Sequence, residues 1–393
     1  MTENERKPLI RFKGFTEAWE QRNAKELCSI TTGKSNTQDQ VDDGKYPFYI
    51  RSDVPVKSNK FLFDEEAVIT IGDGNIGKVF HYVNGKFDLH QRCYKMADFS
   101  YISAKYFYWY FSTKFYKRAM SMTAKATVDS VRLEMISDMP IKYPENKDEQ
   151  SKISAFLFQL DSLITLHQRK CEKLQAVKKG LLDKMFPAAE EREPKIRFKG
   201  FTEAWEQRKL GDIGYCKSGV GFPDCDQGGT FGIPFFKVSD MNSVGNEKKL
   251  KISNNYVSSS QIQAHGWKLF PAPAIFFAKV GAAVLLNRKR LVFTDFLLDN
   301  NTMAFSIDIN NTDVNFMFST FERINLPSLV QIGALPSYNA NQVEDISVFI
   351  PSNIEQKKIG QLFDQLDSII TLHQRTCEKL KNLKSGLLNK MFC

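Results

Sequence analysis

Two stretches of the chain, residues 149–186 and 355–392, carry the same pattern of hydrophobic and polar positions. In each stretch, an isoleucine, leucine or histidine recurs every seven positions. Further apolar residues follow three or four positions after these, so that all of them would lie on one side of a helix. No proline interrupts either stretch, so the pattern predicts two long helices with a wide apolar stripe. The seven-spaced positions, which we predict to form the core of a helix pair, are Ile153, Leu160, His167, Leu174 and Leu181, with Ile359, Leu366, His373, Leu380 and Leu387.

These two stretches are copies of each other, because equivalent residues stand 206 positions apart and segments such as ITLHQR and CEKL are identical. An internal duplication explains the match. Each copy can supply the partner that the stripe of the other copy needs, so we expect the helices to pair as a coiled coil. We expect Leu163 and Val177 to belong to the stripe, and Gly180, Gly360 and Gly386 to be weak points where a helix bends or frays.

A second motif, IRFKGFTEAWEQR, stands unchanged at residues 10–22 and 196–208. The segments that follow the two copies differ from each other, which indicates that the motif has a role common to both halves. We expect Phe12, Phe15 and Trp19 to anchor a domain to the helices, and a contact with a partner is the alternative role of the motif. The order motif, variable domain, helix therefore occurs twice. We predict a first domain at 1–148, a first helix at 149–186, a linker at 187–194, a second domain at 195–354 and a second helix at 355–393.

The two variable segments predict an α+β fold in which each domain is mixed α/β and mainly β. Short runs of β-branched and aromatic residues alternate with Gly, Asp and Asn, as strands and turns do. Each segment also has an aromatic stretch expected to be helical, with Ser103 and Asp313 as caps. Both share one order of runs, so we interpret them as two versions of one domain. The expected strands include 61–63, 67–71, 78–83, 93–97, 233–238, 274–280, 283–287 and 291–294, and the expected helices are 101–120 and 314–325.

Composition narrows the function only slightly. The chain has 393 residues, of which 42% are hydrophobic, and a formal charge of +9. It is long enough for two or three domains, and its charge favours an anionic partner. There is no apolar run near the roughly 18 residues of a membrane span, and the first residues do not form a secretory signal. The seven cysteines show no CxxC spacing, so we expect a cytoplasmic protein with reduced thiols and no metal.

Residues 72–79, GDGNIGKV, nearly match a phosphate-binding P-loop, but Val79 stands where the hydroxyl that holds Mg²⁺ is required. A β-hairpin turn is the simpler interpretation, although the backbone amides and Lys78 could still touch a phosphate. His167 and His373 lack neighbours with metal-ligand spacing, so we interpret them as polar residues that fix helix register. The remaining histidines stand alone, and no catalytic set follows from their spacing.

Basic and amide side chains in the variable domains are the main chemical signal. They can bind phosphates, and Arg, Asn and Gln can read base edges in the major groove of DNA. We favour residues 287–290 and the turn at 51–52, while Lys60, Asn300 and Asn301 add to the signal. The candidate DNA-binding residues are Lys34, Ser35, Asn36, Arg51, Ser52, Lys57, Lys78, Gln91, Arg92 and Lys125 in the first domain, and Lys217, Ser218, Lys237, Ser239, Lys279, Asn287, Arg288, Lys289, Arg290, Tyr338 and Asn339 in the second.

Taken together, these features resemble the specificity subunit of a type I restriction–modification system. The resemblance covers the whole chain. It rests on the duplicated IRFKGFTEAW motif, on the entry into each helix through a proline followed by an EQ pair and an isoleucine, on the LDS core of the helices, and on the two divergent domains. Each motif alone is unspecific, whereas their arrangement is specific.

The resemblance implies that each variable domain is a target-recognition domain that reads one half of a bipartite DNA sequence. It implies that the helices form an antiparallel coiled coil that fixes the gap between the half-sites. It also implies partners: two methyltransferase subunits docked on the duplicated regions, and motor-nuclease subunits. S-adenosylmethionine, ATP and Mg²⁺ are then expected only in those partners. The chain itself is expected to be no enzyme, and it lacks a methyltransferase tetrapeptide of the NPPY or DPPY kind.

Three alternatives stay open at the level of the sequence. One is a sequence-specific DNA-binding protein that acts without enzyme partners. Another is a P-loop NTPase built on Lys78, for which ATP turnover lost in Lys78→Ala would be the evidence. The third is a coiled-coil scaffold, which would leave two large basic domains unexplained.

Overall fold

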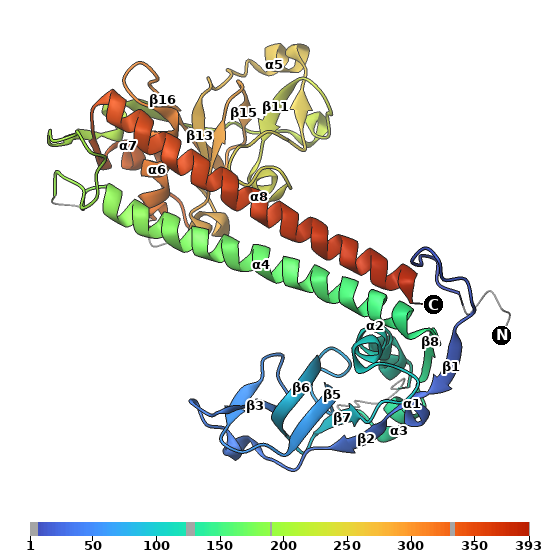
Figure 1. The fold of residues 1–393 in the computed structure, drawn as a ribbon. Helices are drawn as coiled ribbons and strands as arrows, with labels where there is room; N and C mark the ends of the chain where they lie inside the picture. Colours follow the sequence, from blue (N-terminus) through green and yellow to red (C-terminus); the bar gives the residue numbers. More distant parts are fainter. Residues whose placement is uncertain (1–6, 123–129, 189–190, 331–334, 393) are drawn as a thin grey trace. The chain divides into compact units, whose positions relative to one another are not determined.

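The computed structural model describes residues 7–122, 130–188, 191–330 and 335–392 (Figure 1). The chain divides into two compact units, one holding Met1–His167 with Thr376–Cys393 and the other holding Gln168–Arg375. Each unit contains one sheet-rich domain and a segment of each long helix, α4 (Lys147–Met185) and α8 (Asn353–Met391). Both predicted long helices are confirmed, and each begins two residues before its predicted start.

The domain of the first unit is built on a six-stranded sheet with the order β2-β7-β5-β6-β3-β4, and a small sheet pairs β1 with β8. Neighbouring strands are antiparallel except β3 and β6, which are parallel. The elements are β1 (Glu20–Asn23), α1 (Ala24–Leu27), β2 (Ser29–Thr32), β3 (Tyr46–Tyr49), β4 (Val56–Ser58), β5 (Phe63–Ile71), β6 (Phe80–Leu89), β7 (Cys93–Ala97), α2 (Ala104–Met122), α3 (Leu133–Ser137) and β8 (Pro140–Tyr143).

The domain of the second unit repeats this plan. Its four-stranded sheet has the order β10-β16-β13-β14, which matches β2-β7-β5-β6, and β11 pairs in parallel with β15 as β3 does with β6. The prediction of two versions of one domain is therefore confirmed. The elements are β9 (Glu206–Lys209), β10 (Gly214–Ser218), β11 (Ile233–Phe236), β12 (Tyr256–Val257), α5 (Ser259–His265), β13 (Ala274–Ala278), β14 (Lys289–Val292), β15 (Leu297–Leu298), β16 (Thr302–Ile307), α6 (Val314–Arg323), α7 (Ala340–Glu344) and β17 (Ser347–Ile350).

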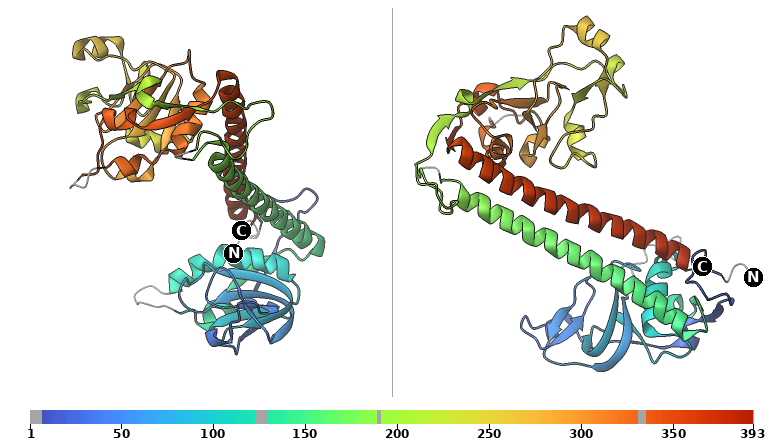
Figure 2. Two further views of the ribbon diagram at one scale, coloured as in Figure 1. Left: turned by 90° about the vertical axis from the view of Figure 1, so that its left-hand side faces the viewer. Right: turned by 45° about the horizontal axis from the view of Figure 1, so that its top comes forward.

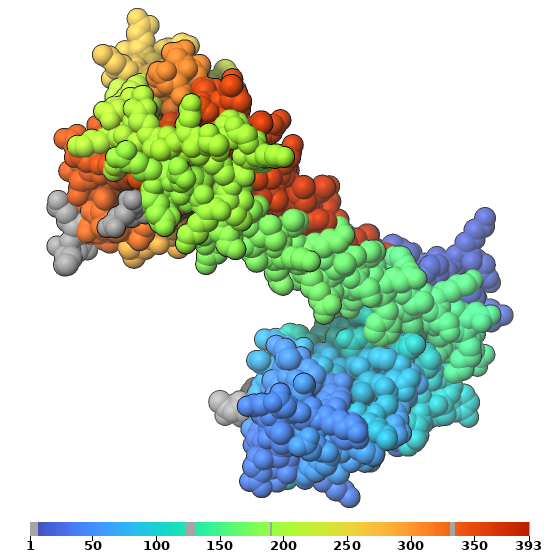
Figure 3. Space-filling model, turned by 60° about the vertical axis from the view of Figure 1, so that its left-hand side comes forward, coloured from blue at the N-terminus to red at the C-terminus, as the bar shows by residue number. Residues whose placement is uncertain are grey.

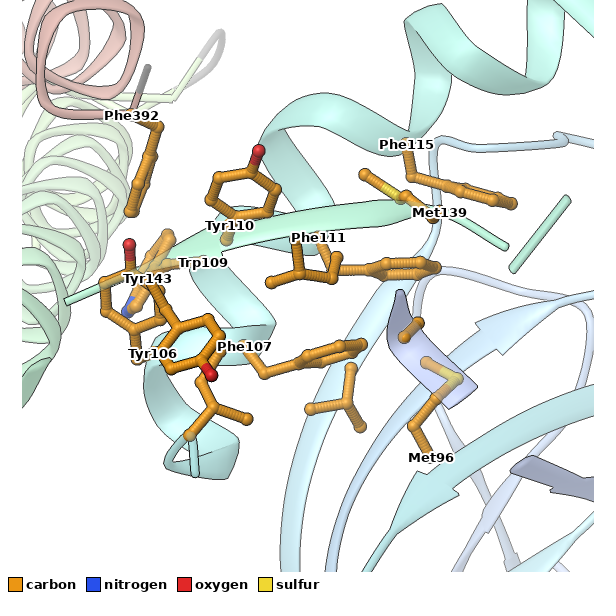
Figure 4. Packing of buried hydrophobic residues seen from close by; sticks show 14 of the residues in the cluster. Met96, Tyr106, Phe107, Trp109, Tyr110, Phe111, Phe115, Met139, Tyr143 and Phe392 are labelled. Carbon is orange, nitrogen blue, oxygen red and sulfur yellow. The ribbon is translucent and has the colours of Figure 1, made fainter. Parts of the chain in front are cut away.

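The predicted aromatic helix of the first domain is α2, which packs along one face of the six-stranded sheet (Figure 2). Its buried rings form a stacked row of Phe107, Phe111 and Phe115, and Phe80 of β6 meets Phe111 edge-on with 5.6 Å between centroids. Figure 4 shows this row together with Phe392, which enters from the end of α8 and lies 5.7 Å from the ring of Tyr106. The C-terminal end of one long helix thus completes the core of the first domain.

The second unit closes its core in the same way with the end of the other helix. Phe186, which follows α4, stacks on Phe316 of α6 at 5.5 Å and meets Trp205 edge-on at 5.7 Å. Asp313 caps α6, because its side chain accepts hydrogen bonds from the backbone amides of Asn315 and Phe316. The aromatic helices and their predicted caps are confirmed in both domains, since Ser103 Oγ also accepts from the first turn of α2.

Within the first unit, the segments of α4 and α8 run antiparallel. Asp161 of α4 bonds to Lys384 of α8 at 2.5 Å, and Ile164, one turn further along α4, contacts Cys377, two turns back along α8. Residue numbers that increase along α4 are therefore paired with residue numbers that decrease along α8, as in antiparallel helices. The pairing of the two helix copies that the apolar stripe predicts is confirmed.

The second unit repeats the pairing with the residues exchanged between the copies. Lys178, the counterpart of Lys384, bonds to Asp367, the counterpart of Asp161, at 2.6 Å. Phe186, which comes directly after the end of α4, lies against Phe363, which precedes Asp367 in α8. The duplication therefore produces the same ion pair twice, once in each unit, and in both units the helices are antiparallel.

Three details of the sequence prediction are wrong. The run at 283–287 is a single-turn 3₁₀-helix (Ala282–Leu286) and no strand, because Gly281 with φ of 83° and Asn287 with φ of 50° turn the chain at either end. Leu163 and Val177 are 44% exposed, so the buried stripe is narrower than expected. Gly360 is also no weak point: a Cβ there would lie 2.3 Å from Asp313 Oδ1, so the glycine allows α6 to approach α8.

The duplicated start motif is held to its helix by a buried ion pair. Arg11 donates from Nε and Nη2 to both carboxylate oxygens of Glu149, at 2.6 and 2.8 Å, and Glu149 is fully buried. Arg197 and Glu355 make the same two-pronged contact at 2.7 and 2.8 Å. A planar guanidinium matches a carboxylate in this way, so the pair fixes the angle between motif and helix as well as their distance.

Two rings of the motif, Phe12 and Phe15, contact residues of α4, as predicted, whereas the ring contact of Trp19 is with a residue of α2. Phe12 meets Phe156 of α4 at 5.9 Å, Lys152 lies 5.0 Å above the ring of Phe15, and Trp19 is buried against Tyr106. Figure 3 shows the second copy of the motif, in yellow-green near residue 200, spread over the orange and red segments of its unit. The motif therefore serves the internal assembly of each unit.

Candidate nucleic-acid interface

Three loops of the first domain meet at the edge of the sheet where β3, β5 and β6 end. Arg51 follows β3, Asp73 follows β5 and Arg92 follows β6. Both guanidinium groups donate to the same oxygen, Asp73 Oδ2, at 3.1 Å from Arg51 and 2.8 Å from Arg92. The side chain of Asp73 is largely buried, whereas those of Arg51 and Arg92 are 45% and 63% exposed. The carboxylate thus holds two exposed arginines side by side.

Neighbouring polar groups extend this cluster. Gln91 donates from Nε2 to Asn36 Oδ1 at 2.6 Å, and the backbone amide of Arg92 donates to Nδ1 of the buried His90. Burial and the nearby Arg51 lower the pKa of His90, so its ring is neutral at neutral pH. The sequence candidates Asn36, Arg51, Gln91 and Arg92 therefore lie together, with Ser52 adjacent to Arg51.

The segment 72–79 is the turn between two antiparallel strands, β5 and β6, as the hairpin interpretation predicts. Gly74 and Gly77 have φ of 81° and 66°, a conformation that side chains disfavour. The turn is followed by a strand, whereas a P-loop needs a helix there. The Lys78 ammonium is 5.5 Å from the ring of Tyr116, and the residue is exposed.

The second domain presents a corresponding edge, because the same backbone bridges recur there. Ser35 and His90 of the first domain correspond to Val220 and Asp299 of the second, and Asp73 and Ser130 correspond to Val280 and Ser337. Two equivalent hydrogen bonds align the rest: the Gly72 amide donates to Arg92 O, and the Lys279 amide donates to Asn301 O. The second edge therefore carries Val280 and Asn301 where the first carries Asp73 and Arg92.

Other candidates of the second domain lie on this edge as well. Lys237 donates to Gln227 at 3.1 Å, and Asn301 donates to Asp299, which is buried and has a raised pKa because of its burial. Asn300 and Asn301 are exposed. The two domains thus share a skeleton and differ in the chemistry of the edge: two arginines on a carboxylate in one, and amides with lysines in the other.

The favoured segment 287–290 does not belong to this edge, which corrects the sequence prediction. Lys289 is buried and donates to Asn287 Oδ1 and Ile324 O, both at 2.7 Å. Arg290 donates to the backbone oxygens of Lys289 and Met241, and Arg288 donates to Asn242. Burial lowers the pKa of Lys289 to about 8. These cations are used within the fold and line a pocket of 480 Å³ beside α8.

Two further candidates are buried inside the fold, and a third, which is exposed, caps a helix. Ser35 is buried and donates to Asp88 at 2.6 Å, Tyr338 is buried and donates to Ala278 O at 2.5 Å, and Asn339 caps α7 through its side chain. Their polar atoms satisfy neighbours, so we no longer assign them to DNA. Lys125 lies outside the described residues. The remaining candidates Lys34, Lys57, Lys78, Lys217 and Ser239 are exposed, and Ser52, Ser218 and Lys279 are half-buried.

Asp73 is the residue of this edge that sequence reasoning missed. It is acidic, so a search for cationic and amide side chains passes over it. The signal that could have found it is its position in the turn after a strand, where a single carboxylate can orient neighbouring arginines. Glu149 and Glu355 were likewise known only as parts of a repeated motif, and their arginine partners follow from the structure.

The described residues also bear on metal binding, membrane insertion and disulfide formation. They contain no group of three His, Cys, Asp or Glu side chains that could hold a metal ion. Among the same residues, no helix is both long and apolar enough to cross a membrane. Among the cysteines in the described part of the chain, Cys28, Cys93, Cys216, Cys225 and Cys377 are free thiols.

Comparison with known proteins identifies relatives of the whole chain. A family model described as "Type I restriction modification DNA specificity domain" matches twice, at residues 16–176 and 202–382. The specificity subunit of the type I restriction enzyme EcoDI from Escherichia coli is 25% identical over 147 residues, which span 37% of this chain and only 32% of that protein. The MjaVIII specificity subunit from Methanocaldococcus jannaschii is 20% identical and covers 95% of this chain and 92% of its own length.

Solved structures agree with the fold. The S subunit of a type I restriction-modification system from M. genitalium superposes with a TM-score of 0.74 at 15% identity, covering 98% of this chain and 99% of that one. A chain from a structural study of complex assembly and conformational transition in the type I R-M system gives a TM-score of 0.53 at 12% identity, with 95% and 97% covered. At these identities the likeness concerns the fold alone.

Proposed function

Because the chain belongs to the family of type I restriction-modification DNA specificity domains and is a specificity subunit, we propose that each of its two domains reads one half of a bipartite DNA site. The observation that carries the proposal is the pair of corresponding sheet edges. A single skeleton presents Arg92 beside Asp73 in one unit and Asn301 beside Val280 in the other. Two readers that share a frame and differ in their base-facing side chains are what a divided, asymmetric sequence requires.

The long helices would then hold the two readers at a fixed separation. Each unit contains the same interhelix ion pair, Asp161 with Lys384 and Lys178 with Asp367, which resists sliding of one helix along the other. Recognition elements that read one face of DNA are separated by about one helical turn, ~10 bp, or a multiple of it. A fixed helix register therefore predicts a fixed number of unread base pairs between the half-sites.

The helices also offer a surface for partner subunits. In the first unit Leu163 and Leu383 are 44% and 49% exposed, and their counterparts in the second unit, Ile369 and Val177, are both 44% exposed. Large apolar side chains at equivalent exposed positions of a duplicated element favour two copies of one partner. We assign this role to two methyltransferase subunits, with motor-nuclease subunits completing the complex.

The chemistry would reside in those partners. Recognition of DNA needs positioned donors and acceptors, which this chain has, whereas methyl transfer and cleavage need S-adenosylmethionine, ATP and Mg²⁺, which we assign to the partner subunits. The purified chain alone is then expected neither to methylate nor to cut DNA.

The test is methylation of a genomic DNA library by the chain co-expressed with the methyltransferase encoded beside it, followed by mapping of the methylated bases. The proposal predicts a split motif of two short half-sites around an unspecified gap of constant length. Replacing residues 23–148 by the corresponding segment of another specificity subunit should change one half of the motif only. A continuous motif would contradict the proposal.

A second possibility is a sequence-specific DNA-binding protein without enzyme partners, since the same two edges would serve it. Co-purification separates the two functions. A stable complex with the methyltransferase that disappears when Leu163 and Ile369 are both changed to Asp supports the subunit, whereas tight, sequence-specific DNA binding by the chain without any complex supports the alternative.

A further inference from the structure

The Arg51–Asp73–Arg92 cluster has a geometry that selects between two uses of arginine on DNA. An arginine can bind a backbone phosphate, which carries no sequence information, or the edge of a base, which does. In this cluster one carboxylate oxygen lies 3.1 Å from Arg51 Nη1 and 2.8 Å from Arg92 Nη1. A phosphate brought to these guanidiniums would also approach the negative charge of Asp73. The pair is therefore better suited to an uncharged partner rich in hydrogen-bond acceptors.

The donors that remain on the arginines fit one base edge in particular. Each guanidinium spends a single N–H group on Asp73 and keeps four of its five donors, enough for a two-pronged contact. In the major groove, guanine presents two acceptors, O6 and N7, to a two-pronged arginine, while adenine presents one acceptor and one donor. Both side chains are well exposed, so they are available to DNA, and Asp73 restricts the directions in which they point.

We propose that Arg92 and Arg51, positioned by Asp73, read guanine in the half-site of the first domain. The inference rests on the proposed function and adds to it the base and the residues that read it. Asp73 is a positioning residue here, because it contacts the arginines and not the base. The first half-site accordingly contains at least one G·C pair whose recognition depends on Arg92.

The second domain provides an internal comparison, because it lacks this arrangement. Val280 replaces the carboxylate and Asn301 replaces Arg92 at corresponding backbone positions. An asparagine amide offers one donor and one acceptor, which suits adenine. Guanine reading through paired arginines is thus expected in one half of the site only. A change in Arg92 should leave the base preference of the other half unaltered.

The experiment uses the complex of the full chain with its methyltransferase. Genomic methylation motifs are mapped for the wild type and for Arg92→Gln, Arg51→Gln and Asp73→Asn. Lys25→Gln is the matched control, since it removes one exposed positive charge from α1 of the same unit, where Lys25 pairs with Asp138. Asn301→Ala is the corresponding change on the second edge.

In the wild type we expect a guanine in the first half-site, and in Arg92→Gln a loss of discrimination at that position of about 10- to 100-fold, with the second half unchanged. Asp73→Asn should weaken the same preference without lowering the amount of folded complex. Lys25→Gln should keep the motif, and Asn301→Ala should alter only the other half. Complex yield and thermal stability are measured in parallel, so that a folding defect is recognised.

Two outcomes would overturn the inference and leave the proposed function intact. One is a split motif whose first half lacks a G·C pair. The other is an unchanged motif in Arg92→Gln with methylation reduced equally at all sites, which is the signature of a phosphate contact. A wild-type complex that methylates no split motif would instead contradict the proposed function itself.

Discussion

At the scale of single residues, the fold depends on charges that are buried and paired. Glu149 and Glu355 are enclosed almost completely, and each accepts two hydrogen bonds from one arginine. Removing one partner of such a pair is more costly than replacing both, because the other charge is left buried without compensation. The duplicated motif is therefore constrained by an electrostatic requirement in addition to its aromatic contacts.

Arg11→Ala is predicted to destabilise the first unit by about 3–5 kcal/mol, because it leaves the Glu149 carboxylate buried without its partner. Urea unfolding followed by tryptophan fluorescence measures the change. Arg197→Ala is the matched variant for the second unit. The double variant Arg11→Met with Glu149→Leu should recover much of the loss, and a double variant as unstable as the single one would show that packing alone matters.

Lys289 provides a pH-dependent prediction. Its pKa in the folded protein is about 8, mainly because burial disfavours the charged form, while the ordinary value is 10.5. Between these values the unfolded chain binds more protons than the folded one, so the free energy of unfolding rises with pH in this window. Below about pH 8 both states are protonated, and the full cost of burying the charge is present.

Lys289→Met should therefore abolish this rise. The free energy of unfolding of the wild type relative to the variant is expected to increase by at most about 3 kcal/mol between roughly pH 7.5 and pH 10. Urea titrations of both proteins at several pH values give the difference directly, and groups that titrate identically in both cancel. A difference that is flat or falls with pH would contradict the assignment.

At the scale of elements, the glycines of the long helices differ in what surrounds them. Gly360 lies against the N-terminus of α6, where a Cβ would meet Asp313 Oδ1 at 2.3 Å and Phe316 N at 2.7 Å, whereas Gly386 has open space around it. Both glycines cost helix stability relative to alanine. Only the first is required by the approach of another element.

Gly360→Ala is predicted to lower stability by about 1–3 kcal/mol, because the cap of α6 must move away from α8. Gly386→Ala, the matched substitution, should raise it by about 0.5–1 kcal/mol through helix propensity alone. Thermal unfolding of the two variants beside the wild type measures both effects. Equal and positive shifts in the two would show that the contact with α6 is not restrictive.

The sequence predicted the helices and their pairing well, but it predicted the roles of individual charged side chains less well. Periodicity and duplication were enough to place both long helices, the aromatic helices and the pairing of the two copies, because these depend on patterns repeated over many residues. The roles of Lys289 and Asp73 depend on which loops meet in space. Lys289 looks like a surface cation in the sequence and is buried, while Asp73 looks incidental and joins two arginines.

At the scale of the whole molecule, the two units are closed in equivalent ways by different parts of the chain. In the second unit the Ile196 amide donates to Lys184 O at 2.9 Å, across the short segment that joins helix and motif. In the first unit the Ile10 amide donates to Lys390 O at 3.1 Å, and there the two partners come from opposite regions of the sequence. The same hydrogen bond between helix and motif thus forms twice. In the second unit a short peptide segment links its two partners, whereas in the first unit they are far apart in the sequence.

A circular permutant that joins residue 393 to residue 1 through a copy of PAAEEREP, and opens the chain within 187–194, is predicted to fold and to direct methylation to the same motif. The reason is that PAAEEREP already connects the first helix to the second motif, and the new linker would connect the second helix to the first motif, where the same hydrogen bond forms. Motif mapping of the permutant complex tests it. Opening the chain inside α2 instead, between residues 111 and 112, should abolish folding because it divides a buried helix.

The exchanged ion pairs have an implication for ancestry. Asp161 bonds to the residue that corresponds to Lys178, and Asp367 bonds to Lys178 itself. A shorter polypeptide with only the first motif, domain and helix would already contain both an aspartate and a lysine of this kind. Two molecules of it could form both bonds reciprocally, as a symmetric homodimer does. The present chain is what gene fusion of such a dimer would produce, and after fusion the two domains could diverge independently, as the proposed reading of two different half-sites requires.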